Sequence, residues 1–111
     1  MLVAFVINCF SIRGTETNAW AYAHYNESVL GNSSLMVVRK CPVAAKEHDF
    51  SPAVEAHFRN RFKANVVQVD DAAIEPLLAD KGVAVCMVAC GGFSHEYWPR
   101  NVPTISHCVF N

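Results

Sequence analysis

The chain has 111 residues, of which 52% are hydrophobic and 17% charged, and its formal net charge is −1 at pH 7. This length fits one domain with one hydrophobic core, and the apolar composition excludes a disordered chain. A net charge close to zero offers no general attraction to nucleic acid or to an anionic membrane, so neither is an expected partner.

The chain opens with an apolar run at 2–10 that only Asn8 interrupts. It is about half as long as a membrane span, and no basic segment or small-residue cleavage site marks it as a secretory signal, so no transmembrane segment is predicted. A continuous apolar run of this length is typical of a strand covered on both faces. The five cysteines lie mostly in apolar stretches, which predicts reduced thiols and a cytoplasmic location.

The next elements alternate between helix and strand. Thr15 is expected to cap a helix that runs to about residue 30, where Gly31 ends it. A second strand is predicted at 34–39. Ser51 followed by Pro52 then predicts the start of a second helix, which places an apolar side chain at every fourth position.

The rest of the chain repeats this alternation. A third strand is predicted at 65–69, followed by a helix that starts near residue 70 and ends at Gly82. Pro76 removes a hydrogen bond from a helix interior, so the helix is expected either to start near Glu75 or to have an irregular first turn. The last two strands are predicted at 83–89 and 104–110.

This alternation predicts an α/β fold. We expect a Rossmann-like, three-layer α/β/α arrangement around a parallel sheet of about five strands in the order 3-2-1-4-5, with 1–111 as a single domain. No helix follows the fifth strand, so the domain is expected to be incomplete at its C-terminus. The uncovered sheet then favours self-association.

Ligands of such sheets bind beyond the carboxyl ends of the strands, where the strand order reverses. The loops after strands one and four meet there, and both contain glycine: Gly14 in the first, Gly91 and Gly92 in the second. The first loop opens a helix, whose N-terminus favours phosphate, and Arg13 can add a charge-assisted contact. The glycines can equally be simple turn residues, and neither loop has a dinucleotide or P-loop signature.

Two histidines are candidates at the same edge. His107 lies near the end of strand five, where it can act on a ligand or be a core residue bonded to a carbonyl. His95, among aromatic residues, can contact a ligand or belong to an aromatic plug. His48 and His57 are expected to be solvated. His24, in the middle of a helix, has the same two interpretations as His107: it can act on a ligand or be a core residue.

No metal or cofactor is predicted. Cys86 and Cys90 are four residues apart on a strand, a separation of about 13 Å that one zinc ion cannot bridge, so both are expected to be packing residues. A phosphoacceptor receiver domain is also excluded, because strand one ends in Asn8-Cys9-Phe10 without a carboxylate.

Several motifs occur in a characteristic order. They are Arg13-Gly14-Thr15-Glu16, then AYAHYNE at 21–27, LGN at 30–32, HFRNRF at 57–62 and SHCVF at 106–110. Together they resemble a group of GT-B-fold glycosyltransferase-like proteins from viruses and bacteria, and the likeness is most specific at 13–32. The resemblance implies the N-terminal, acceptor-side Rossmann-like domain of such an enzyme.

The resemblance also implies roles for individual residues. Gly14, Thr15 and Glu16 would face the diphosphate of a nucleotide-sugar donor, and His107 would lie near the transferred sugar. The partners would be this donor and a sugar acceptor. The donor-binding C-terminal domain is absent from the 111 residues, so the chain alone is expected to be inactive. The segment 90–100 departs from the family's pattern.

Two other interpretations stay open. The chain can be a standalone small-molecule or nucleotide-binding module that completes its fold by dimerisation, or a truncated product without a function.

Overall fold

The structure is a computed structural model that describes residues 1–11, 14–40, 50–90 and 99–108. Its strands are β1 (Leu2–Ile7), β2 (Ser33–Arg39), β3 (Val66–Val69), β4 (Val85–Cys90) and β5 (Thr104–Cys108). Its helices are α1 (Gly14–Ser28), α2 (Pro52–Phe62) and α3 (Asp71–Lys81), with a short 3-10 turn, η2 (Lys63–Asn65), before β3.

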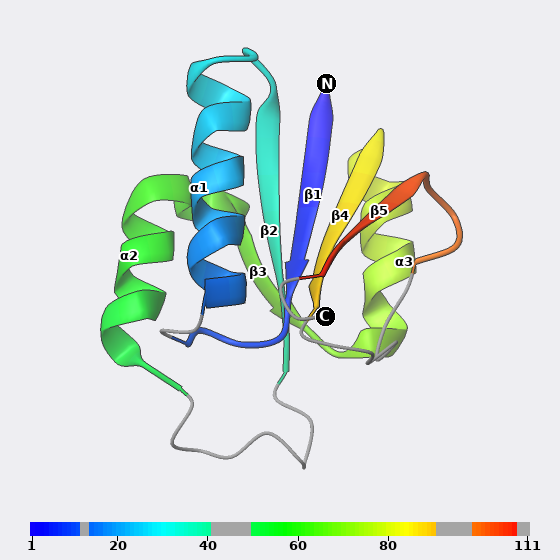
Figure 1. The fold of residues 1–111 in the computed structure, drawn as a ribbon. Coiled ribbons are helices and arrows are strands. Elements are labelled where there is room, and N and C mark those ends of the chain that lie inside the picture. The colour runs from blue at the N-terminus through cyan, green and yellow to red at the C-terminus, as the bar shows by residue number, and fades with distance from the viewer. Residues whose placement is uncertain (12–13, 41–49, 91–98, 109–111) are drawn as a thin grey trace.

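The strands form one parallel sheet in the order β3-β2-β1-β4-β5, which confirms the predicted order (Figure 1). At its centre, Phe5 of β1 is in register with Met36 of β2 on one side and with Met87 of β4 on the other. The chain therefore builds outward from β1 in one direction through β2 and β3, and in the opposite direction through β4 and β5. The strand order reverses between β1 and β4.

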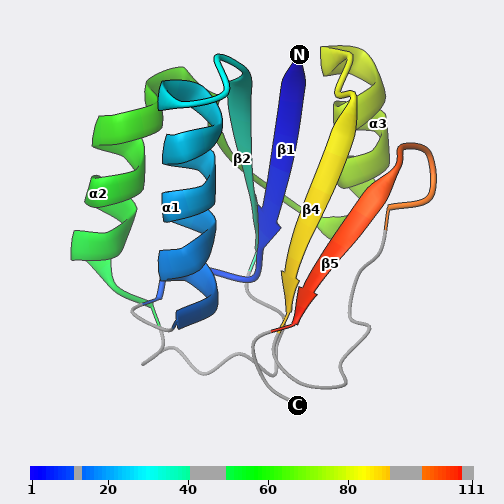
Figure 2. The same cartoon turned by 45° about the horizontal axis from the view of Figure 1, so that its top comes forward.

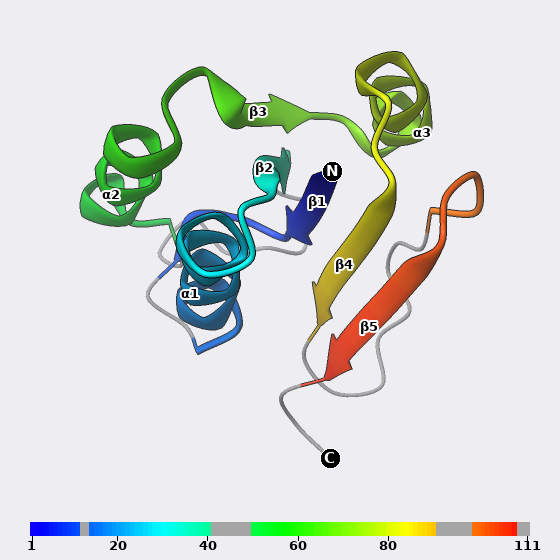
Figure 3. The ribbon, with the colours of Figure 1, turned by 90° about the horizontal axis from the view of Figure 1, so that it is seen from above.

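The helices cover the two faces of the sheet unequally. Figure 3 shows α1 and α2 on one face and α3 on the other, which makes the fold a three-layer α/β/α arrangement. Because successive side chains of a strand point to opposite faces, β1 supplies both clusters: Phe5 and Ile7 belong to the cluster of α1 and α2, whereas Ala4 and Val6 belong to that of α3.

The predicted boundaries of α1 and α2 agree closely with the structure. The first helix ends at Ser28, about two residues earlier than expected, and Gly31 follows with a positive φ of 72°. The backbone N–H of Gly31 still donates to the carbonyl of Glu27, at 3.2 Å. Ser51 is the N-cap of α2 as predicted, since its side chain accepts a hydrogen bond from the backbone N–H of Val54 at 3.3 Å.

Of the two alternatives predicted for Pro76, a helix start near Glu75 was wrong, whereas the first turn does contain a short bond from the backbone N–H of Ala73 to the carbonyl of Asp70, at 2.9 Å. Helix α3 starts at Asp71 and continues through Pro76 to Lys81, where Gly82 ends it with a φ of 67°. A proline removes only one hydrogen bond at this depth in a helix. Ile74 and Leu78, on either side of it, are fully buried against the sheet, so packing holds the helix together across the missing bond.

Candidate ligand site at the carboxyl edge of the sheet

Two candidate residues that are far apart in the sequence, Gly14 and His107, lie at one edge of the sheet. Gly14 is the first residue of α1, and the first turn of this helix lies on the same side as the carboxyl ends of β1, β4 and β5 (Figure 2). His107 is on β5 in register with Ala89, one residue before β4 ends. The structure gives backbone positions alone for Thr15 and His107. Arg13, Gly91, Gly92 and His95 lie outside the described residues, and their roles stay predictions.

Glu16 is in the first turn of α1, where its side chain is 3% exposed. Its Oε2 accepts a hydrogen bond from the hydroxyl of Ser11 at 2.9 Å, and Ser11 is itself buried. A buried carboxylate needs such donors, because burial without them is costly. This contact connects the segment that leaves β1 to the start of α1. The geometry thus supports a positioning role for Glu16, while direct contact with a ligand stays a prediction.

A second polar cluster lies at the ends of β1 and β2. Arg39, the last residue of β2, donates from Nε and Nη2 to the two carboxylate oxygens of Asp71, at 2.8 and 2.7 Å. Its Nη1 donates to the side-chain oxygen of Asn8 at 2.8 Å. The Arg39 side chain is only 6% exposed, compared with 45% for Asp71. The cluster therefore joins the ends of two strands to the first turn of α3.

The ion pair also sets the protonation of Asp71. The hydrogen bonds from Arg39 hold the pKa of Asp71 below its ordinary value, against the opposing effect of burial, and the Arg39 charge adds to the lowering. The paired, ionised state is the stable one near neutral pH. Sequence reasoning missed this cluster because its members are about thirty residues apart; the available signal was an arginine that ends an otherwise apolar strand.

The AYAHYNE motif lies at the opposite end of α1, where its contacts are structural. The Asn26 amide donates to the hydroxyl of Ser34 at 2.9 Å and to the carbonyl of Ser33 at 3.2 Å. Glu27 Oε2 accepts from the backbone N–H of Ser34 at 3.1 Å. These bonds attach the last turns of α1 to the first residues of β2. The residues that carry the strongest resemblance therefore divide between the candidate site and this attachment.

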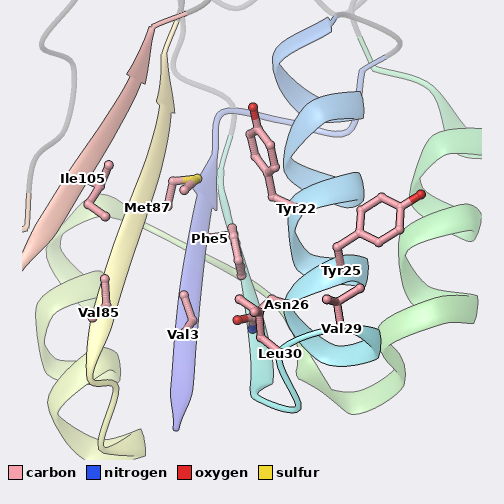
Figure 4. Close-up of a pocket in the computed structure, with 10 residues that line it drawn as sticks. All are labelled: Val3, Phe5, Tyr22, Tyr25, Asn26, Val29, Leu30, Val85, Met87 and Ile105. Carbon is pink, nitrogen blue, oxygen red and sulfur yellow. The ribbon is translucent and has the colours of Figure 1, made fainter.

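An open apolar hollow of about 410 Å³ lies between α1 and the strands β1, β4 and β5 (Figure 4). Its lining residues are Val3, Phe5, Tyr22, Tyr25, Asn26, Val29, Leu30, Val85, Met87 and Ile105. Ligand sites combine apolar walls with a few convergent polar groups. The amide of Asn26 already bonds to β2, and Glu16, the candidate residue whose side chain the structure describes, does not line the hollow. We therefore interpret the hollow as an uncovered part of the core.

The structure describes the surroundings of Cys86, His57 and His24, three residues whose settings were predicted from the sequence. Cys86 is fully buried, and burial raises the pKa of its thiol to about 12, which confirms that it is a packing residue. His57 is exposed as predicted, although its ring stacks on Trp20. His24 accepts a hydrogen bond from Arg61. Among the residues that the structure describes, no cluster of three His, Cys, Asp or Glu side chains is arranged to hold a metal ion.

These observations define a Rossmann-like α/β domain with a candidate ligand site at the carboxyl edge of its sheet. Comparison of the sequence with models of known protein families gave no match, and comparison with curated proteins gave no significant match. Within the described ranges, no helix is both long and apolar enough to cross a membrane.

Proposed function

We propose that this chain is the N-terminal, acceptor-side portion of a glycosyltransferase that uses a nucleotide-sugar donor, and that it needs a second, donor-binding domain for activity. The observation that carries the proposal is the position of Gly14 and Glu16, which belong to the R-G-T-E motif and lie in the first turn of α1. Gly14 opens α1 at the carboxyl edge of β1, on the edge where β5, with His107, also ends. The strand order and the resemblance at 13–32 support the same assignment.

The chemistry of this edge suits a donor diphosphate. The first N–H groups of a helix have no partner within the helix, and the helix dipole adds partial positive charge there, so the start of α1 favours an anion. The hydrogen bond from Ser11 to Glu16 holds Ser11, which follows β1, against the first turn of the helix. His107 would orient the transferred sugar or handle a proton during transfer. The buried, protonated thiol of Cys86 suits the reducing cytoplasm that we propose as its location.

The second candidate function is a standalone small-molecule or nucleotide-binding module that completes its fold by dimerisation. The observation that favours it is the apolar hollow beside α1, because Tyr25 and Leu30 at its rim are 58% and 70% exposed. Contiguous exposed apolar side chains of this size usually mark a contact surface.

Calorimetry separates the two candidates. UDP-sugars and GDP-sugars are titrated into the 111-residue chain, and a donor site that lies mainly in another domain predicts a Kd of about 1 mM or weaker. Binding with a micromolar Kd favours the standalone module instead. The reading frame downstream of Asn111 gives an independent check, since the proposal predicts roughly 200 further residues with a second βαβ pattern.

A further inference from the structure

Helices α1 and α2 meet along a stack of three aromatic rings. The indole of Trp20 lies nearly parallel to the imidazole of His24, on the same helix, with ring centroids 5.2 Å apart. It is also nearly parallel to the imidazole of His57 on α2, at 4.4 Å. Phe62 of α2 meets the indole edge-on at 6.0 Å. Trp20 therefore contacts two imidazole rings, one from each helix.

One guanidinium connects this stack to the rest of the layer. Arg61 of α2 donates from Nε to Nδ1 of His24 at 3.0 Å, and from Nη1 to Oε1 of Glu27 at 2.8 Å. The other oxygen of Glu27 accepts from the backbone of Ser34. Arg61 thus ties α2 to α1 directly and, through Glu27, to the start of β2.

The hydrogen bond fixes the protonation state of His24. An imidazole nitrogen accepts a hydrogen bond only when it carries no proton, so Nδ1 is bare and the ring proton is on Nε2. Protonation of Nδ1 would place an N–H opposite the N–H of Arg61 and a second positive charge about 3 Å from the first. The contact seen here exists only with neutral His24.

We propose that His24 is a pH-sensitive latch between α1 and α2, which holds Arg61 when the imidazole is neutral and releases it when the imidazole is protonated. The titratable and charged side chains that the structure places around His24 are Tyr25 and Glu27 on its own helix, and Arg61 and His57 on α2. Glu27 already pairs with Arg61, so its charge offsets the repulsion only in part. Protonated His57 acts in the opposite direction, because a cation over the indole face strengthens the stack.

Thermal unfolding of the 111-residue chain between pH 7.5 and pH 5.0 tests the latch. In His24→Asn, the amide oxygen takes the place of Nδ1 and accepts from Arg61 without titrating. The wild type is expected to lose about 4 °C more in Tm than His24→Asn over this range. The matched control, His57→Asn, removes the other stacked imidazole and is expected to lose at least as much as the wild type. An equal loss in the wild type and His24→Asn would overturn the proposal.

A measurement on the wild type alone needs no variant to fold. Nitrogen-15 NMR should show an unprotonated Nδ1 in His24 at pH 7.5, together with a slowly exchanging Nε–H in Arg61. The protected Arg61 signal should disappear as His24 titrates. An Arg61 signal that is unchanged across the His24 titration, or a protonated Nδ1 at pH 7.5, would show that the latch does not exist.

Discussion

Replacing Asp71 with alanine tests whether the cluster at the ends of β1 and β2 stabilises the fold. The substitution leaves the guanidinium of Arg39, 6% exposed, without the carboxylate that holds it in two hydrogen bonds. Removing one partner of a buried ion pair costs about 3–5 kcal/mol. Asp71 itself is 45% exposed and Arg39 keeps its bond to Asn8, so water can partly replace the lost carboxylate. We therefore expect the free energy of unfolding to fall by about 2 kcal/mol.

The neighbouring residue provides the matched control. Asp70 pairs with Lys40 at 3.8 Å, and both of these side chains are largely exposed. Surface pairs of this kind contribute about 0–1 kcal/mol, so Asp70→Ala should have little effect. Urea unfolding at pH 7, followed by circular dichroism, measures both variants. The reasoning is refuted if Asp71→Ala is no more destabilising than Asp70→Ala.

The same pair predicts a pH dependence with a defined sign. The hydrogen bonds from Arg39 lower the pKa of Asp71 in the folded chain below its ordinary value of 3.8. The folded state therefore binds this proton less readily than the unfolded state, and the pair's contribution is fully present above pH 4–5 and lost as the pH falls further. The difference in unfolding free energy between the wild type and Asp71→Ala should shrink from pH 5 to pH 3. A constant difference would mean that the pair does not titrate as described.

The remaining predictions concern Glu16 and the apolar hollow. Glu16→Ala leaves the buried hydroxyl of Ser11 without this acceptor, so we expect a loss of about 1–3 kcal/mol, more than the 0.3–1 kcal/mol typical of an exposed first-turn carboxylate. A melting temperature equal to that of the wild type would show that the hydrogen bond between Ser11 and Glu16 does not stabilise the fold. The chain should also self-associate, because Val29 and Leu30 are exposed beside the hollow. Light scattering after size-exclusion chromatography measures this, and Leu30→Lys should reduce the self-association more than the control Lys81→Ala on α3. A monomer at all concentrations would count against an interface there.

Much of the fold was predictable because each element carries a local signal. The apolar run of β1, the N-cap at Ser51 and the glycines at 31 and 82 depend on neighbours in the sequence, and the structure agrees with them to within a few residues. The sequence left open whether α3 starts before Pro76 or near Glu75, because burial of Ile74 and Leu78 decides between the two. Tertiary packing overrides local preference at such positions.

The candidate site was predictable in position more than in detail. Strand order alone places Gly14 and His107 at one edge, as parallel sheets require. The burial of Glu16 and its bond to Ser11 depend on how the loop after β1 returns to α1, which no periodicity encodes. The ion pair of Arg39 and Asp71 likewise joins residues that only the folded sheet brings together.

Sugar transfer by the longer, two-domain protein that we propose tests the proposed function most directly. Transfer from UDP- or GDP-sugars and the melting temperature should be measured on the same preparations of the wild type, His107→Ala and the control His57→Ala. We predict transfer by the wild type and by the control, and a loss of about 10²–10⁴-fold in kcat for His107→Ala with little change in Tm. A His107→Ala variant that melts early yet transfers sugar at the wild-type rate per folded molecule would contradict the account, as would a wild type that transfers no sugar.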